Sequence, residues 1–377
     1  MDKRITHAAA DKTGLTVTVD GNEKFFSWLW VRDHSQEPGA FHQEARQRLL
    51  ETFNLGLVPP ADTVSVDEIG EELVASWRGT PVSRFTADYL AAVTVPDRLY
   101  DVIGSDQTVW DANNATECCQ TVKHDDFAND DDVLAMMLQN LRRYGMILVK
   151  DVPLSTEASR RVVERIAYIR SSIFGEMWDL KSNAKMADTG ATPLEITPHS
   201  DGTYNHDAPG LMSLHCLKYE AEGGDNSLVD GFNIAQIIRR EYPQAYKILS
   251  TVLVPGQYIG DGAYLVAQRT PLRHDVLGQL VQVSFNNHDR APFSLPEPEM
   301  SQLYDALRVF DGLIKNISNQ FVFGLRPGDM VIFDNWRLLH GRKEYKGSRH
   351  VVGCYLNRED FESRMRMLAK CPMNMVS

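Results

Sequence analysis

The chain has 377 residues, with 51 acidic side chains against 39 lysines and arginines and a formal net charge of -12. This acidic balance argues against nucleic acid or an anionic membrane surface as a partner, because both attract positively charged surfaces. Hydrophobic residues at 43% and charged residues at 24% are ordinary values for a globular protein. No apolar run approaches membrane-spanning length, so we expect no membrane association and a cytoplasmic location.

The length exceeds what one compact core usually serves, so we expect two domains. Residues 1–95 predict a small β-rich N-terminal domain, in which Leu15-Thr16-Val17-Thr18-Val19 alternates before an Asp20-Gly21 turn. Residues 96–130 are polar and irregular and are predicted to be a linker. Residues 131–377 form the second domain in this interpretation.

Apolar spacing in the second part predicts helices and short strands in mixed order. The acidic run 130–132 is typical of a helix cap before the apolar-periodic segment that follows. Further helices are predicted over 155–173, 234–248 and 299–318. Strands are predicted over 144–150, 211–216, 227–232, 281–285 and 328–333, with glycine turns between several of them. The fold class is therefore mainly β with inserted helices, as in a sandwich or jelly roll.

The cysteines favour neither a disulfide framework nor a thiolate metal site. The chain has five of them, two are adjacent as Cys118 and Cys119, and no Cys-x-x-Cys occurs. We interpret them as reduced thiols that pack as small hydrophobic side chains.

A candidate metal site begins at His199 and Asp201, which stand two residues apart and point to one face if the segment is extended. A second imidazole, His340, lies far downstream. Two histidines and one carboxylate are the ligand set of non-haem Fe(II) oxygenases, which leave the opposite face of the metal open. The His-x-Asp pair alone is weak evidence, because with eleven histidines it is also explained by a polar turn.

An arginine follows the second histidine at a distance that fits a co-substrate site. Arg349 stands nine residues after His340 and precedes the apolar run 351–355. A guanidinium there is suited to hold a carboxylate through two parallel hydrogen bonds, which a lysine could not do. Taken alone, Arg349 is better explained as a surface charge. Together with the two histidines and Asp201 it favours a 2-oxoglutarate-dependent oxygenase.

Longer motifs strengthen this interpretation. From roughly residue 10 to 370 the chain resembles the γ-butyrobetaine hydroxylase and trimethyllysine hydroxylase family. The resemblance rests on segments 30–33 (WVRD), 174–178 (FGEMW), 198–201 (PHSD), 224–232 (GDNSLVDGF), 285–290 (FNNHDR) and 333–342 (FDNWRLLHGR). It implies a double-stranded β-helix domain behind the N-terminal domain and a homodimer. It also implies hydroxylation of a C–H near a trimethylammonium group with Fe(II), 2-oxoglutarate and O₂.

The resemblance also assigns residues. It implies that His199, Asp201 and His340 are the iron ligands and that Arg349 binds the 2-oxoglutarate carboxylate. Trp178 and Tyr355 match the aromatic cage of the family, and Tyr204 is a candidate to complete it. Such a cage suits a quaternary cation, which donates no hydrogen bonds but is attracted to aromatic faces. The alternative for Trp178 and Tyr355 is ordinary core packing.

One departure from the family concerns zinc. Family members commonly bind zinc through cysteines that follow the Arg-Asp of the N-terminal domain. The corresponding segment 32–40 (RDHSQEPGA) has no cysteine. His34 and His42 alone cannot make a closed four-ligand site, so we expect no structural zinc.

The second departure concerns the substrate. Counted without gaps from Trp178 to His199, a cage tyrosine becomes Ala191, and an asparagine that holds the substrate carboxylate becomes Asp188. A carboxylate beside an anionic substrate group is repulsive unless it faces the cation. Asn287 remains at a second anion-binding position, with Lys185 and Arg290 as nearby candidates in sequence.

These changes suggest a modified pocket for a small trimethylammonium substrate. We lean to 2-trimethylaminoethylphosphonate, because a dianionic phosphonate would need a differently built anion site. γ-Butyrobetaine and trimethyllysine hydroxylation are the alternatives. A non-enzymatic alternative is a quaternary-ammonium sensor that has lost catalysis, against which the complete set of candidate ligands and Arg349 speak.

Overall fold

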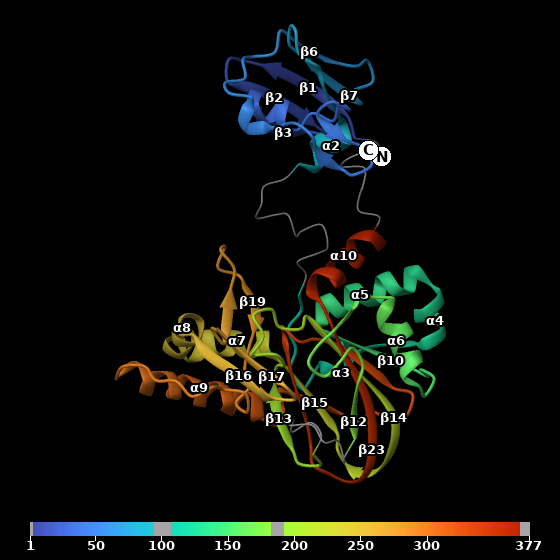
Figure 1. Ribbon diagram of the computed structural model, residues 1–377, viewed down its shortest axis with the longest axis vertical. Helices are drawn as coiled ribbons and strands as arrows, with labels where there is room; N and C mark the ends of the chain where they lie inside the picture. The colour runs from blue at the N-terminus through green and yellow to red at the C-terminus, as the bar shows by residue number, and fades with distance from the viewer. Residues whose placement is uncertain (1–2, 94–106, 182–191, 370–377) are drawn as a thin grey trace. The chain divides into compact units, whose positions relative to one another are not determined.

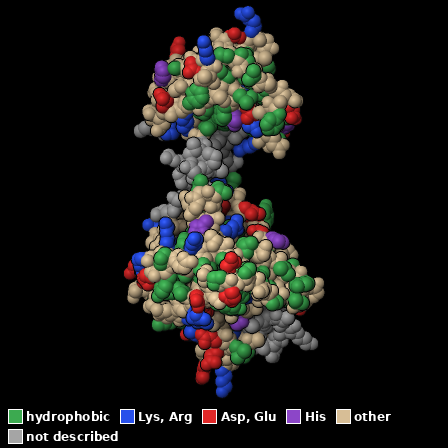
Figure 2. Space-filling view, turned by 90° about the vertical axis from the view of Figure 1, so that its left-hand side faces the viewer, with side chains coloured by type: hydrophobic (Ala, Val, Ile, Leu, Met, Phe, Trp, Pro, Cys, Tyr) green, Lys and Arg blue, Asp and Glu red, His purple; other side chains and the backbone are tan. Residues whose placement is uncertain are grey.

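The computed structural model describes residues 3–93, 107–181 and 192–369, which group into two compact units, 3–93 and 107–369 (Figure 1). Each unit has its own hydrophobic core. Among the described residues, no helix is both long and apolar enough to cross a bilayer. On the face drawn in Figure 2, acidic and basic side chains are interspersed over each unit.

The N-terminal unit contains two antiparallel three-stranded sheets and two short helices. The strands are β1 (Ile5–Ala10), β2 (Gly14–Val19) and β3 (Asn22–Ser27) in one sheet and β6 (Thr63–Val66), β7 (Glu72–Ser76) and β8 (Ser83–Thr86) in the other. The helices are α1 (Trp28–Asp33) and α2 (Ala87–Ala92), and the elements β4 (Phe41–His42), β5 (Gln47–Arg48) and η1 (Thr52–Asn54) lie between the sheets in sequence. Trp28 is buried edge-on against Trp77 in the core of this unit.

The N-terminal unit does not fit a zinc ion in its described residues. The His34 ring stacks on Trp30, and its Nδ1 lies 3.1 Å from the Trp30 carbonyl oxygen. The Nδ1 of His42 accepts a hydrogen bond from the Ala45 amide. Neither imidazole belongs to a described group of three or more His, Cys, Asp or Glu side chains with converging ligand atoms.

Two facing sheets form the larger unit. The major sheet has the order β11-β23-β14-β21-β10-β9, with β12 also paired to β23. Its strands are β9 (Gln120–Lys123), β10 (Met146–Lys150), β11 (Ile169–Arg170), β12 (Trp178–Lys181), β14 (Leu211–Gly223), β21 (Met330–Asp334) and β23 (Tyr345–Leu356). The minor sheet has the order β13-β22-β15-β20, from β13 (Ile196–His199), β15 (Asn226–Asp230), β20 (Gln320–Phe323) and β22 (Leu338–Arg342). This confirms the predicted fold class, a double-stranded β-helix with inserted helices.

Helices cover the outer face of each sheet, and a third core lies between the sheets (Figure 1). The major sheet is covered by α4 (His124–Asn129), α5 (Asp131–Tyr144), α6 (Thr156–Glu164) and α10 (Arg358–Leu368). The minor sheet is covered by α7 (Gly231–Glu241), α8 (Pro243–Thr251) and α9 (Glu299–Lys315). Further elements are α3 (Ala115–Cys118), η5 (Ile317–Asn319) and two hairpins, β16 (Val254–Gly260) with β17 (Ala263–Arg269) and β18 (Leu272–His274) with β19 (Leu280–Val283).

Three elements differ from the sequence predictions. Residues 107–130, assigned to the predicted linker over 96–130, belong to the larger unit, where β9 pairs in parallel with β10. The helix predicted over 155–173 ends at Glu164, and Ile169–Arg170 instead pairs with the end of β23. The helix predicted over 234–248 is two helices, because Pro243 begins a new one after a break at Tyr242. The predicted cap is confirmed, since the Asp130 carboxylate accepts from the Asp132 and Val133 amides.

A buried ion pair connects the end of β15 and the turn after β21 to the last turn of α5 and to residues 108–110. The Arg337 guanidinium is 0% exposed and donates to both Asp230 oxygens, over 3.1 and 2.7 Å. It also donates to the carbonyls of Arg143 and Thr108. Asp230 accepts in addition from the Trp110 amide, so the pair and its remaining hydrogen-bonding atoms are satisfied internally. Such a pair is costly to break, because one charge is then left buried without its partner.

We predict that Arg337→Met lowers the free energy of unfolding by about 3–5 kcal/mol, since it leaves Asp230 unpaired in the interior. Urea unfolding of the full chain measures the loss. The matched control is Arg308→Met, which removes an exposed pair with Asp305 and should change stability by less than about 1 kcal/mol. A loss below 1 kcal/mol for Arg337→Met would contradict the structural role given to this pair.

Candidate functional site

The candidate site is a pocket between the major and minor sheets. Residues from both sheets line it, together with the segments that enter and leave them. The lining side chains are Phe174, Trp178, Asp179, Leu180, Ile196, His199, Asp201, Met212, Leu214, Asn226, His340, Arg342, Tyr345, Arg349, Val351 and Tyr355. Of the residues singled out in the sequence, the pocket therefore brings together His199, Asp201, His340, Arg349, Trp178 and Tyr355.

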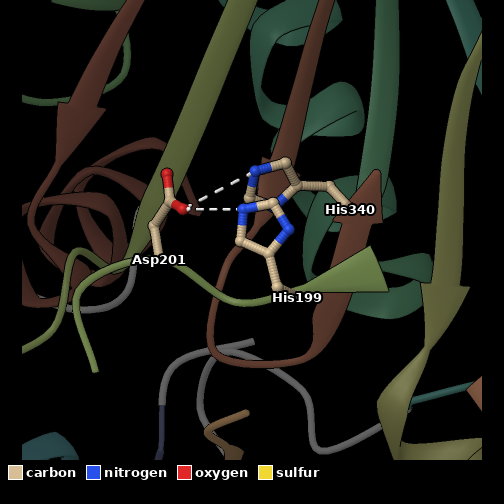
Figure 3. Close-up of side chains that lie close together, drawn as sticks. All are labelled: His199, Asp201 and His340. Atoms are coloured by element: carbon tan, nitrogen blue, oxygen red, sulfur yellow. Dashed lines mark ion pairs between the residues drawn. The ribbon is translucent and has the colours of Figure 1, made fainter. Parts of the chain in front are cut away.

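His199, Asp201 and His340 converge on one point of the pocket (Figure 3). His199 ends β13 and pairs across the minor sheet with His340 of β22, while Asp201 lies just after β13. One Asp201 oxygen lies 3.3 Å from His199 Nε2 and 3.7 Å from His340 Nε2. The potential ligand atoms all lie within 4.8 Å of one another. Two imidazole nitrogens and a carboxylate oxygen at this spacing fit a divalent transition metal such as Fe(II).

Hydrogen bonds outside the cluster hold these side chains in place. The His199 Nδ1 lies 2.9 Å from the Thr197 carbonyl, which leaves its Nε2 as the metal-facing nitrogen. The Asn335 side chain pairs with the Asp201 peptide, accepting from its amide and donating to its carbonyl. The Tyr355 hydroxyl donates to the second Asp201 oxygen over 2.6 Å. The first Asp201 oxygen is thereby directed to the imidazoles.

The electrostatics of the cluster give Asp201 and His340 the protonation states that a metal ion needs. Burial lowers the pKa of His199, but the hydrogen bond to Asp201 and its charge outweigh burial and raise this pKa in the metal-free cluster. Burial and the nearby His199 lower the pKa of His340 to about 4. Burial alone would raise the pKa of Asp201, but His340 and His199 outweigh it and hold this pKa below its usual range. At neutral pH Asp201 is therefore ionised and His340 is neutral, so both offer lone pairs to a cation.

Arg349 lines the same pocket from β23 of the major sheet, and its guanidinium is incompletely paired. It is 7% exposed and donates from Nη2 to Asn226 Oδ1 over 3.0 Å. Its Nε and the Asn226 Nδ2 are both buried without a partner among the described residues. Burial lowers the pKa of Arg349, but an arginine stays charged at neutral pH. A buried cation with an unsatisfied donor, beside a second unsatisfied donor, fits the far carboxylate of 2-oxoglutarate.

Aromatic rings form another wall of the pocket. The Trp178 and Tyr355 ring centroids are 5.3 Å apart, and both rings are nearly buried. Trp178 lies directly over Gly353 of β23, since a Cβ atom there would come within 2.2 Å of the indole carbons. Gly353 therefore allows the close approach of the indole to the strand. Phe174 contributes a further ring to the same pocket.

Tyr204 lies in an adjoining pocket that shares Phe174 and Tyr355 with the first. Its ring packs 5.3 Å from that of Tyr258 on β16, which in turn meets Phe174 edge-on. The structure thus places Tyr204 behind the aromatic wall, among the rings that support it. Tyr258 was not a sequence candidate, and its only sequence signal is an aromatic residue at an inward position of a hairpin.

Two of the remaining candidates lie away from the metal pocket. Asn287 and Arg290 lie together in a separate pocket beside Thr203 and Gly256. Asp188, Lys185 and Ala191 lie outside the described residues. The substrate argument built on Asp188 and Ala191 is therefore without a structural test.

Sequence reasoning missed two residues that contact the cluster or the guanidinium. Asn335, which holds the Asp201 peptide, stands inside a quoted motif but was not given a role. Asn226, the partner of Arg349, likewise stands in the motif 224–232. A buried asparagine immediately after a strand of apolar residues is the signal that would have suggested Asn335.

A mainly β fold whose facing sheets carry two histidines, a carboxylate and a nearby buried arginine defines a non-haem metal oxygenase class. Comparison with family models agrees: residues 112–355 match the taurine catabolism dioxygenase TauD, TfdA family, and the chain belongs to that family. The matched region includes His199, Asp201, His340 and Arg349. The protein is an Fe(II)- and 2-oxoglutarate-dependent dioxygenase.

Curated relatives cover nearly the whole chain. The chain is 29% identical to trimethyllysine dioxygenase of Meyerozyma guilliermondii over 98% of its own length and 96% of the relative's. It is 30% identical to mitochondrial trimethyllysine dioxygenase of Mus musculus, covering 94% of this chain and 85% of that one. It is 26% identical to γ-butyrobetaine dioxygenase of Pongo abelii, covering 93% and 92%. The predicted resemblance to this group of dioxygenases is confirmed.

We predict that His340→Ala abolishes both Fe(II)-dependent succinate formation and tight binding of Co(II), because it removes one of three converging ligand atoms. Succinate release and Co(II) titration of the metal-free chain measure the two effects. His350→Ala is the matched control, because His350 contacts Asp179 and does not belong to the cluster. Substantial residual turnover in His340→Ala would overturn the ligand assignment.

Proposed function

We propose that this dioxygenase hydroxylates an aliphatic carbon of trimethyllysine. The observation that carries the proposal is that the metal cluster, an unsatisfied buried guanidinium and facing aromatic rings all line one pocket. This combination provides one place each for a metal, a carboxylate and a quaternary cation. The names of the relatives support trimethyllysine as the molecule that brings the cation.

In this proposal His199, Asp201 and His340 hold Fe(II), and Arg349 grips the far carboxylate of 2-oxoglutarate. Bound Fe(II) supplies the activation of O₂, coupled to decarboxylation of 2-oxoglutarate to succinate. The chain orients the His199 imidazole through the Thr197 carbonyl, and the neighbouring histidines keep Asp201 ionised. Arg349 also fixes the co-substrate at one end, which orients its other end toward the cluster.

Trp178 and Tyr355 receive the trimethylammonium group in this proposal. The two ring centroids are 5.3 Å apart with the ring planes tilted by 50°, and both residues line the pocket that contains the metal cluster, which supports this assignment. A quaternary ammonium is weakly hydrated and gains from contact with aromatic faces. Because both rings are anchored on β12 and β23, they fix the distance between the cation and the cluster, which selects the carbon attacked.

Trimethyllysine takes precedence over the phosphonate favoured from the sequence. The phosphonate interpretation rested on Asp188 and Ala191, which lie outside the described residues, and the relatives reported above are named for trimethyllysine and γ-butyrobetaine. The sensor alternative is not supported, because the chain belongs to a dioxygenase family. A homodimer and a cytoplasmic location stay predictions, which size-exclusion chromatography with light scattering and cell fractionation would check.

We predict that, with Fe(II), ascorbate and 2-oxoglutarate, trimethyllysine stimulates succinate release and yields an equal amount of hydroxylated product. The same assay is run with γ-butyrobetaine and with 2-trimethylaminoethylphosphonate, and succinate and product are both followed by mass spectrometry. Lysine without methyl groups is the matched control, because it lacks the quaternary cation. Coupled product from the phosphonate alone would overturn the proposal and restore the interpretation of Asp188 as part of a rebuilt anion site.

We predict that Gly353→Ala weakens trimethyllysine binding by roughly tenfold, because the new methyl group displaces the Trp178 indole from β23. Calorimetric titration of the Co(II)-loaded chain measures this. The affinity for 2-oxoglutarate should stay within about threefold, since Arg349 is untouched. Gly312→Ala is the control, because a Cβ at Gly312 meets nothing within 4 Å. If the affinity of Gly353→Ala for trimethyllysine is unchanged, the assignment of Trp178 to the cation cage is wrong.

A further inference from the structure

We infer that Tyr355 is a positioning residue for the metal carboxylate and that it links this carboxylate to the pocket for the quaternary cation. The metal half of the inference depends only on the cluster geometry. The cation half rests on the proposed function. The two halves can be tested separately, because the hydroxyl of Tyr355 contacts the metal carboxylate whereas its ring lines the cation pocket.

Asp201 has more freedom than the two histidines, so it needs an external restraint. His199 and His340 sit on paired strands of the minor sheet, whereas Asp201 lies in the irregular segment that follows β13. Asn335 fixes the Asp201 peptide, and both of its hydrogen bonds to this residue are made with the backbone. Rotation about the side-chain bonds of Asp201 would still turn either oxygen toward the imidazoles or away from them.

The Tyr355 hydroxyl supplies that restraint. It donates to Oδ2 of Asp201 over 2.6 Å, while Oδ1 lies 3.3 Å from His199 Nε2. Because the phenol hydroxyl is hydrogen-bonded to Oδ2, Oδ1 is the carboxylate oxygen that faces the two imidazoles. Oδ1 would therefore be the atom that binds a metal ion, and Oδ2 already has a hydrogen-bond partner. Hydrogen bonds of this kind from outside the ligand set typically change metal affinity by about 10- to 100-fold.

The rigidity of Tyr355 makes it suited to this role. It lies in β23, where its backbone is paired with Met212 of β14 on one side and with Arg170 of β11 on the other. The side chain is 7% exposed. Its position is therefore set by the major sheet, so the hydroxyl transmits the geometry of that sheet to an aspartate beside the minor sheet.

The ring of the same residue forms part of the cation pocket. Its centroid lies 5.3 Å from that of Trp178, and both residues line the pocket with the cluster. A cation held against this ring restricts its movement and draws electron density from it, which makes the hydroxyl a stronger donor to Asp201. By linkage, a ligand that tightens the metal site is itself bound more tightly when the metal is present.

The test is the variant Tyr355→Phe, which keeps the ring and removes only the hydroxyl. The metal-free full chain is titrated with Co(II) in the absence of 2-oxoglutarate and trimethyllysine, and binding is followed by the visible absorption of Co(II). We expect the dissociation constant to rise about tenfold and the Co(II) spectrum to change. Thermal unfolding of the metal-free variant, compared with the parent chain, separates a loss of folding from a loss of metal binding.

Tyr345→Phe is the matched control, because Tyr345 lines the same pocket but packs against Arg342 rather than Asp201. Its Co(II) affinity should match the parent chain. A folded Tyr355→Phe with Co(II) affinity within twofold of the parent chain overturns the positioning role. Equal losses in both variants would also overturn it, since the effect would then belong to the pocket as a whole.

A second titration tests the link to the cation. In the parent chain, saturating trimethyllysine should tighten Co(II) binding, and this gain should disappear in Tyr355→Phe and in Trp178→Leu. A gain that persists in Tyr355→Phe overturns the link. If the parent chain shows no binding of trimethyllysine at all, the proposed function fails, whereas the first titration still decides the role of Tyr355 at the metal site.

Discussion

The buried pair between Asp230 and Arg337 is the interaction on which the metal site depends. Asp230 ends β15 in the minor sheet, and Arg337 lies in the turn that leads from β21 of the major sheet to β22. The same turn carries Asn335, which holds the Asp201 peptide, and continues into His340. One satisfied charge pair at zero exposure therefore fixes the turn that places two of the three candidate ligands.

The pocket combines charges that the overall composition does not suggest. The chain is acidic as a whole, yet Arg349 and Arg342 both line this pocket, and burial and the nearby Arg349 lower the pKa of Arg342 to about 10. The Nη2 of Arg342 donates to the Thr192 and Leu194 carbonyls. Arg349 donates to Asn226 and keeps a buried Nε without a partner among the described residues. The net charge thus argues against extended polyanions but says little about a small dicarboxylate, for which one buried cation would be enough.

The motifs predicted much of the site, because the chemistry of the metal fixes which residue types it needs. His199 and Asp201 are recognisable by their spacing, but His340 lies 139 positions after Asp201. It is joined to the pair only by the ligand set that it completes and by the resemblance, because no local pattern connects it to them. The strand-to-strand pairing that brings His340 opposite His199 is a long-range event without a local signal. The contact from Tyr355 to Asp201 has the same origin and could not be predicted from spacing.

Predictions from local sequence patterns were wrong where tertiary contacts outweighed local preference or where polar residues proved to be part of the folded unit. The apolar intervals after residue 164 suit a helix, but Ile169–Arg170 is an edge strand because β23 offers unpaired backbone there. The polar residues 107–130 suggested a linker, yet Trp110 is buried against the Asp230 pair and β9 completes the sheet. Asn287 carried a substrate role by resemblance, while the structure places it in a separate pocket.

Strand β23 carries several parts of the site on one face, because Arg349, Val351, Gly353 and Tyr355 alternate with the residues of the other face. The backbone geometry of β23, rather than that of loops, therefore sets the spacing between the Arg349 guanidinium, the Gly353 position on which the Trp178 indole packs, and the Tyr355 phenol. An inserted or deleted residue within β23 would turn part of this series to the wrong face. Relatives of this protein that act on substrates of different length should therefore differ in the pocket walls that face β23. The register of β23 itself should be the same in all of them.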